Sequence, residues 1–259
     1  MEVSILTIGT GKYIDFIPRL IESVEKNFLK EHNKTYYVFT DSQLPIEVKN
    51  TKIVKIYQEK LGWPYDTMMR FHMFSYIEKK LKKSDLSFFF NSNMEFVEEV
   101  GEEILPNMID EFFIGVNHPG YFKSNTDNMP YERRKESNFF IEDSDNTNKN
   151  YYQGCFNGGD SKKFIEMSKI LSSKIDGDLN SNIIPIWHDE SAINWYFRNI
   201  KVKTLNPEYA LPEQILDGDF ISAKKNHLQK HCYDFLENVK PYAIQRDKRK
   251  YGGTDVLRK

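Results

Sequence analysis

The stretch from Trp187 to Ser191 gathers an indole, an imidazole, two carboxylates and a hydroxyl at five consecutive positions. The apolar residues that follow, up to Phe197, recur at helical spacing and predict a helix with Glu190 in its first turn. The helix dipole there favours an ionised carboxylate, which suits a nucleophile or an oxocarbenium stabiliser better than a general acid. Ordinary helix capping by Asp189 and Glu190 accounts for the same residues, so both interpretations stay open.

Two amides, Asn91 and Asn93, follow the aromatic run Phe88-Phe89-Phe90. Alternation in an extended segment points both side chains the same way. Two carboxylates so placed would hold a divalent cation, but amides lack the charge that this hard ion prefers. Amides can instead hydrogen-bond a ribose hydroxyl or a phosphate, as donor and acceptor together. A plain turn after a strand is the alternative interpretation.

Two shorter motifs also have a functional and a structural interpretation. The loop Gly9-Thr10-Gly11 either contacts a nucleotide or only turns the chain. Tyr13, just beyond it, could stack on a base or cover the core. His118, followed by Pro119-Gly120, is either catalytic or a residue of a turn.

A basic segment lies at the C-terminus, where Arg246 to Lys250 and Arg258-Lys259 flank Tyr251-Gly252-Gly253. A basic terminus is usually only solvated. Beside a diphosphate, this one could close as a lid on its two glycines and neutralise a leaving group.

The elements that must position these groups alternate between strands and helices. Strands are predicted at Val3–Ile8, Tyr36–Phe39, Ile53–Ile56 and Ser87–Phe90, and helices at Ile14–Phe28, Thr67–Leu81, Phe164–Ile175 and Ala192–Phe197. This alternation predicts an α/β fold with a Rossmann-like, largely parallel sheet in one domain. Ligands bind such sheets at the carboxyl ends of the strands, where Gly9 and Asn91 fall. The polar segment Lys123–Asn150 predicts a mobile loop.

Composition excludes several classes of function. The formal net charge of -2 and the pI near 6.3 give no bulk attraction to nucleic acid or to an anionic membrane. No apolar segment approaches the length that spans a bilayer, and no signal peptide precedes the first strand. With two cysteines, Cys155 and Cys232, we expect no disulfide framework and a cytoplasmic location.

Several separated stretches together resemble glycosyltransferase family 6, the retaining transferases that include the blood-group A and B enzymes. The stretches occur in the family's order and cover nearly the whole chain. They are Tyr36–Asp41, Asn91–Phe96, His118–Gly120, Tyr131–Arg134, Tyr151-Tyr152 with Gly158-Gly159, Trp187–Ser191 and Pro207–Tyr209.

The resemblance implies a GT-A fold, with a nucleotide-binding half at 1–95, an acceptor-binding half at 96–240 and a basic C-terminal lid at 241–259. It implies transfer of galactose or N-acetylgalactosamine from a UDP donor, forming an α1,3 bond to a galactoside or a 2′-fucosylgalactoside. A non-catalytic UDP-sugar-binding protein and a UDP-sugar hydrolase are the alternatives.

The family's functional positions carry over residue by residue. Uridine contacts fall on Ile8, Gly9, Thr10 and Tyr13, other donor contacts on Arg70 and Asp189, and the donor-selecting positions on Gln153, Gly154 and Cys155. His118 and Trp187 match acceptor contacts. Glu190 also matches an acceptor contact, and it matches the family's proposed nucleophile or stabiliser. The volume of Cys155 tilts the donor toward galactose, whereas metal-independent relatives use N-acetylgalactosamine, so the sugar stays open.

Three departures from the family pattern shape the expectations. The chain begins at the first strand, without an anchor or stem, and looks like the soluble bacterial members. Asn91 and Asn93 replace both ends of the metal-binding Asp-x-Asp, so the chain looks like the metal-independent branch, and we expect no metal and no cofactor. Charge on the departing UDP would then be balanced by Arg246, Lys248 and Arg258, with Arg70. The acceptor-binding Asp after Pro-Glu-Tyr is replaced by Leu211-Pro212-Glu213.

Overall fold

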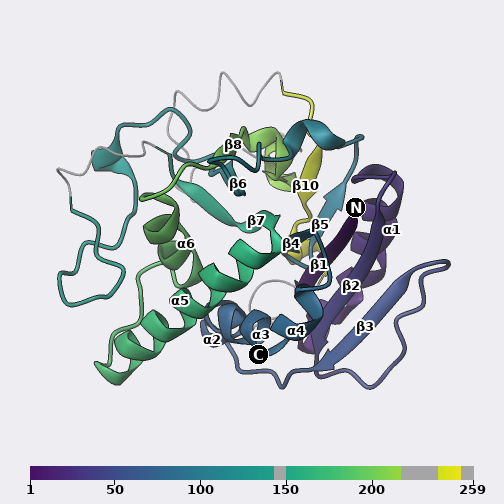
Figure 1. The fold of residues 1–259 in the computed structure, drawn as a ribbon, viewed down its shortest axis with the longest axis horizontal. Helices are drawn as coiled ribbons and strands as arrows, with labels where there is room; N and C mark the ends of the chain where they lie inside the picture. The colour runs from purple at the N-terminus through teal and green to yellow at the C-terminus, as the bar shows by residue number, and fades with distance from the viewer. Residues whose placement is uncertain (143–149, 217–238, 252–259) are drawn as a thin grey trace.

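A central seven-stranded sheet has the order β3-β2-β1-β4-β7-β6-β8 in a computed structural model that describes residues 1–142, 150–216 and 239–251 (Figure 1). The strands are β1 Glu2–Ile8, β2 Asn33–Thr40, β3 Lys52–Tyr57, β4 Leu86–Phe90, β6 Phe113–Asn117, β7 Tyr152–Asp160 and β8 Lys203–Leu205. All the pairings are parallel except those of β7, which runs antiparallel to β4 and β6. The predicted α/β class with a mostly parallel sheet is confirmed.

The reversal of β7 determines which residues share one edge of the sheet. Asn117, the last residue of β6, pairs with Tyr152, the first residue of β7. Just past the end of β4, the Asn91 amide donates to the carbonyl of Cys155 at 2.9 Å. The first residues of β7 therefore lie beside the carboxyl ends of β4 and β6, the edge at which parallel sheets bind ligands.

A second, three-stranded sheet attaches the C-terminal part of the chain. Its strands are β5 Met94–Phe96, β10 Ala243–Gln245 and β9 Leu211–Pro212, in the order β5-β10-β9. β10 pairs antiparallel with β5 and parallel with β9. Because β5 follows the Asn91–Asn93 turn directly, the residues after β10 are brought to the same edge of the central sheet.

Helices cover both faces of the central sheet. α1 Ile17–Asn27, preceded by a 3-10 turn at Gly11–Phe16, lies on one face, and α3 Arg70–Tyr76, α5 Ser161–Asn180 and α6 Asp189–Phe197 lie on the other (Figure 1). The shorter elements are α7 Glu213–Leu216 and 3-10 turns at Glu102–Ile104, Thr126–Asn128, Pro207–Tyr209 and Lys248–Tyr251. Among the described residues, no helix is both long and apolar enough to cross a bilayer.

The helix predicted over Thr67–Leu81 is instead three short helices: α2 Tyr65–Met68, α3 Arg70–Tyr76 and α4 Glu78–Leu81. The buried residues Met68, Phe71, Phe74 and Ile77 recur every three positions. Residues at this spacing stay on one face of a helix only if the chain winds more tightly than an α-helix. The amides of His72 and Ile77 accordingly bond carbonyls three residues back.

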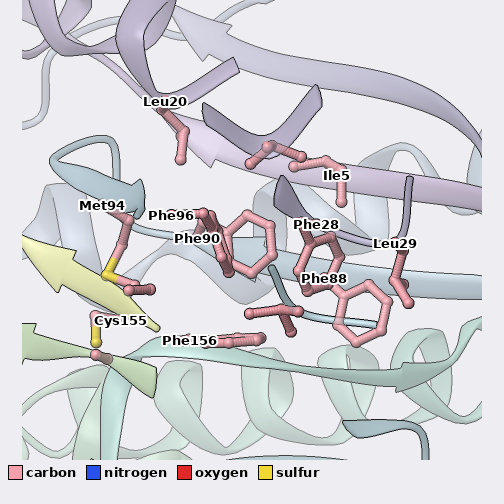
Figure 2. Packing of buried hydrophobic residues seen from close by; sticks show 14 of the residues in the cluster. Ile5, Leu20, Phe28, Leu29, Phe88, Phe90, Met94, Phe96, Cys155 and Phe156 are labelled. Atoms are coloured by element: carbon pink, nitrogen blue, oxygen red, sulfur yellow. The ribbon is translucent and has the colours of Figure 1, made fainter. Parts of the chain in front are cut away.

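Alternation along each strand divides the core between the two faces. Phe88 and Phe90 of β4 pack with α1, whereas Phe89 packs with α3 on the opposite face. Phe28 is the centre of the first cluster, with its ring centroid 5.3 Å from that of Phe88 and 4.9 Å from that of Phe96 (Figure 2). The aromatic run before Asn91 thus anchors β4 from both sides and fixes the turn that follows.

The described part of the polar loop, residues 123–142, is irregular as predicted but is attached to its surroundings. Ser137 Oγ donates to the buried Asp178 carboxylate of α5 at 2.6 Å. Glu132 is buried, pairs with Arg134 at 2.6 Å and accepts the Ile186 amide at 2.8 Å. This loop therefore holds the segment that leads into α6.

Candidate active site

Two adjoining pockets open at the carboxyl edge of the central sheet. The larger has a volume of about 470 Å³ and the smaller about 160 Å³. Trp63, Thr67, Arg70 and Asn91 line both pockets and form the junction between them. A bisubstrate reaction needs this arrangement, because two ligands must meet at one reacting atom.

The smaller pocket collects most of the residues predicted to hold a nucleotide. Ile8, Thr10, Tyr13, Asn93 and Lys248 all line it. The Lys248 ammonium lies 5.1 Å from the centroid of the Tyr13 ring, within cation–π range. An aromatic ring next to a cation suits a base and a phosphate of one ligand.

Arg70 is the buried centre of the junction. Its Nη1 donates to the Gly154 carbonyl at 2.7 Å, its Nη2 pairs with Asp189, and its guanidinium carbon lies 4.3 Å from the centroid of the Phe89 ring. Burial lowers the pKa of Arg70 to about 9, so it remains charged at neutral pH. A Cβ at Gly154 would overlap the Asp189 carboxylate, which explains why β7 has a glycine here.

Glu190 lies in the larger pocket, held by two hydrogen bonds. Its Oε1 accepts the Gly154 amide at 2.8 Å and its Oε2 accepts the Tyr151 hydroxyl at 3.2 Å. Burial raises the pKa of Glu190 to about 7, although both hydrogen bonds and the Arg70 charge act to lower it. The predicted helix start is confirmed, and burial opposes the ionised form of this carboxylate that the dipole is expected to favour.

A strained turn presents the acidic pair. His188 has φ 53° and ψ -117°, and the Glu190 amide donates to the Trp187 carbonyl at 2.9 Å. These are the features of a type II′ turn, whose first central position ordinarily takes glycine. The His188 ring makes an edge contact with Trp63 at 5.0 Å between centroids, across the pocket. Backbone strain at a residue with a Cβ, this close to Glu190, is typical of a functional site.

The residues predicted to contact an acceptor line the larger pocket. His118 and Trp187 both lie there with Tyr121, and Trp187 remains 37% exposed. His118 Nδ1 accepts the Gly120 amide at 3.0 Å, which fixes the orientation of the ring. Tyr151, whose hydroxyl bonds Glu190, is buried beneath the His118 ring at 5.9 Å between centroids. The acceptor side of the pocket is thus aromatic and rigidly supported.

Gln153, Gly154 and Cys155, the positions predicted to select the donor, also line the larger pocket. Gln153 is buried, and its Oε1 accepts from Gln245 of β10 at 2.9 Å. Cys155 is a buried free thiol whose pKa is raised by burial, while Cys232 lies outside the described residues.

Asn91 and Asn93 do not fit a divalent cation. Asn93 Nδ2 donates to the Arg246 carbonyl at 2.9 Å, and its Oδ1 is a neutral acceptor that is buried without a hydrogen-bond partner among the described residues. Asp66, the one carboxylate among the described residues that line the smaller pocket, already accepts the Leu61 and Gly62 amides. Across residues 1–142, 150–216 and 239–251, no three His, Cys, Asp or Glu side chains form a metal-binding group.

Two predicted donor contacts, Gly9 and Arg246, are not brought to the pockets, and the position of a third is not described. Gly9 lines neither pocket: its amide donates to the Phe39 carbonyl at 2.9 Å, and it serves to turn the chain. The Arg246 guanidinium lies 3.2 Å from Glu213 and 3.6 Å from Glu95. Arg258 lies outside the described residues.

Trp63 is the most prominent pocket residue that the sequence motifs do not predict. It is 55% exposed and lines both pockets. Trp63 follows Gly62 and precedes Pro64 in the loop after β3, so the rule that ligands bind beyond the carboxyl ends of strands could have found it. Tyr151 had a sequence signal in the paired tyrosines, but its bond to Glu190 depends on the path of β7.

The mostly parallel sheet and the two pockets at its carboxyl edge, the larger of which contains the Glu190 carboxylate, fit a glycosyltransferase with a GT-A-like fold. Residues 1–238 match the profile of Glycosyltransferase family 6. The chain belongs to this family.

Relatives occur in bacteria and in animals. The chain is 36% identical over 241 residues to the O-antigen biosynthesis glycosyltransferase WbnI of Escherichia coli, covering 93% of this chain and 100% of that protein. It is 30% identical over 218 residues to globoside alpha-1,3-N-acetylgalactosaminyltransferase 1 of Gallus gallus, covering 81% of this chain and 61% of that protein. It is 27% identical over 240 residues to histo-blood group ABO system transferase 2 of Rattus norvegicus, covering 87% of this chain and 70% of that protein.

Proposed function

We propose that the protein transfers galactose or N-acetylgalactosamine from a UDP donor to a galactoside, plain or 2′-fucosylated, with retention and an α1,3 linkage. The observation that carries this is the junction at Arg70, where a nucleotide-sized pocket meets a larger one containing Glu190. The names of the relatives, an O-antigen glycosyltransferase and an alpha-1,3-N-acetylgalactosaminyltransferase, support the same reaction class. A cytoplasmic role in assembling a surface glycan belongs to this proposal.

Each pocket then has a role in binding. Uridine lies against Tyr13, Ile8 and Thr10 in the smaller pocket, with the diphosphate between Lys248 and the junction. The donor sugar extends past Arg70 toward Asp189 and Glu190. The galactoside enters the larger pocket beside His118 and Trp187.

Glu190 performs the chemistry in one of two ways. Its carboxylate attacks the anomeric carbon as the bond to UDP breaks. The acceptor hydroxyl oxygen then attacks the same carbon, the bond from that carbon to Glu190 breaks, and the hydroxyl proton passes to a phosphate oxygen of the departing UDP. Alternatively, the acceptor hydroxyl attacks on the face from which UDP departs while Glu190 stabilises the oxocarbenium charge. Both routes require an ionised Glu190, and the Gly154 and Tyr151 hydrogen bonds hold it in place.

Charge on the departing UDP is balanced by protein cations in this proposal, without a divalent metal. Lys248 and Arg70 line the smaller pocket and are the described cations best placed to do so. A fixed ammonium in a partly dehydrated site stabilises a developing anion without reorganisation. Arg258 keeps its proposed role, although it lies outside the described residues.

A transfer assay tests the function. Purified protein is incubated with UDP-galactose or UDP-N-acetylgalactosamine and with lactose or 2′-fucosyllactose, and products are identified by mass spectrometry and by NMR of the new linkage. We expect an α-linked trisaccharide or tetrasaccharide with one donor preferred. Free sugar that added acceptor does not suppress would indicate a hydrolase. UDP binding without any product would indicate a non-catalytic binding protein.

A further inference from the structure

The segment Arg246–Lys250, which we call the strap, leaves β10 and brings Lys248 to the smaller pocket. If Lys248 balances the diphosphate charge, its contribution depends on how firmly the strap is held, because a mobile lysine loses most of its electrostatic effect to entropy and solvent. The contacts that fix the strap therefore bear directly on donor binding.

One buried carboxylate, Glu213 at the start of α7, binds the strap on both sides of Lys248. The Glu213 side chain is only 9% exposed. Its Oε2 accepts the Asp247 amide at 2.6 Å, and its Oε1 lies 3.2 Å from Arg246 Nη1 and 3.2 Å from Lys250 Nζ. Charge-assisted hydrogen bonds of this kind are stronger than neutral ones.

The small sheet places Glu213 at this point. Gln245 of β10 pairs with Pro212 of β9, so Glu213 comes next to the first residues of the strap. Asn93 provides a second anchor from the opposite side, since its Nδ2 donates to the Arg246 carbonyl and its carbonyl accepts the Arg246 amide at 2.8 Å. The contact with the Arg246 carbonyl requires an amide side chain at position 93, because a carboxylate could not donate a hydrogen bond to it.

The described basic side chains of the strap, those of Arg246, Lys248 and Lys250, are thus divided between two tasks. Arg246 and Lys250 are directed to Glu213, whereas Lys248 lines the smaller pocket over Tyr13. We infer that Glu213 is a positioning residue for the donor: it fixes the strap so that Lys248 faces the diphosphate, with Arg246 and Lys250 serving as its fastenings. The inference rests on the proposed function of the smaller pocket.

Calorimetric titration with UDP, in EDTA, tests this with four variants: Lys248→Ala, Glu213→Ala, the double variant and Glu95→Gln. Lys248→Ala should weaken UDP binding about 10- to 100-fold, the value of one charge-assisted bond. Glu213→Ala should weaken it about tenfold or more. The double variant should bind no more weakly than Lys248→Ala alone, because Glu213 acts through Lys248.

Glu95→Gln is the matched control. Glu95 also faces the Arg246 guanidinium, at 3.6 Å, but its main partner is Arg19 at 2.9 Å. UDP affinity should change less than about twofold. Thermal unfolding of each variant separates positioning from loss of the fold. If Glu213→Ala does not fold, Glu213→Gln, which keeps the volume and one acceptor oxygen, should still weaken UDP binding measurably.

The results separate this inference from the function on which it rests. If Glu213→Ala binds UDP with wild-type affinity, or if the losses add in the double variant, the role of Glu213 is overturned. The proposed function still stands in that case, provided that Lys248→Ala binds UDP more weakly than wild type. Unchanged affinity in Lys248→Ala, or no UDP binding by the wild type, would overturn both.

Discussion

Glu190 lies in the first turn of α6, where the helix dipole favours an ionised carboxylate, yet burial raises its pKa to about 7. The Gly154 amide and Tyr151 hydroxyl hold the side chain in place whether it is protonated or not. The residue is therefore positioned by hydrogen bonds, and its charge depends on pH near neutrality.

Replacement of Glu190 by Gln should reduce turnover about 10²- to 10³-fold, the usual cost of removing a group that stabilises transition-state charge. UDP affinity should stay within about threefold of wild type, because the smaller pocket does not include Glu190. Wild-type turnover should rise between pH 6 and pH 8 as the carboxylate ionises, and the variant should lack that rise. Near-normal turnover in the variant would remove Glu190 from the mechanism.

The raised pKa of Glu190 also predicts how stability depends on pH. Below the ordinary carboxyl pKa of 4.5, the group is protonated in both states and carries no penalty. As pH rises toward about 7 the unfolded chain ionises first, so the stabilising contribution of protonated Glu190 is lost, up to about 3 kcal/mol. In urea unfolding, Glu190→Gln should therefore gain stability relative to wild type at pH 8 but not at pH 4. An equal difference at both pH values would contradict the raised pKa.

At the scale of elements, the first turn of α6 is presented by strained backbone at His188, with φ 53°. A glycine adopts this conformation freely, whereas any residue with a Cβ is strained. His188→Gly and His188→Ala both lose the Trp63 contact, so their comparison isolates the backbone. The Gly variant should be more stable to urea than the Ala variant by about 1–2 kcal/mol. If the His188→Ala variant is as stable as the His188→Gly variant, the backbone at His188 does not store strain.

The strands of the N-terminal half could be predicted from sequence because periodicity and β-branched or aromatic residues report them directly. The reversed direction of β7 could not, because a strand buried on both faces has no pattern that reveals its polarity. One wall of the larger pocket depends on this reversal, which brings Gln153, Gly154 and Cys155 to the ligand edge. The predicted Thr67–Leu81 segment is helical, but it is divided at Met69 and Ile77, where its three-residue apolar spacing favours a tighter turn.

At the scale of the whole molecule, the residues predicted for uridine, apart from Gly9, and those predicted for the acceptor separate into the two pockets, with Arg70 and Asn91 lining both. Glu213 had no such signal, since the strap amide that it accepts lies 34 residues away in sequence and the contact requires β9 and β10 to pair. Local motifs therefore identified the groups that would touch ligands, and only the fold revealed the groups that hold them.

The proposal that protein cations take the place of a divalent ion rests on the neutral amides Asn91 and Asn93 and on the placement of Lys248. The most direct test is the initial rate of sugar transfer to the preferred galactoside, measured with EDTA and with manganese. We predict equal rates within about twofold, because fixed cations already balance the charge on UDP. A rate abolished by EDTA and restored by manganese would contradict metal-independent transfer.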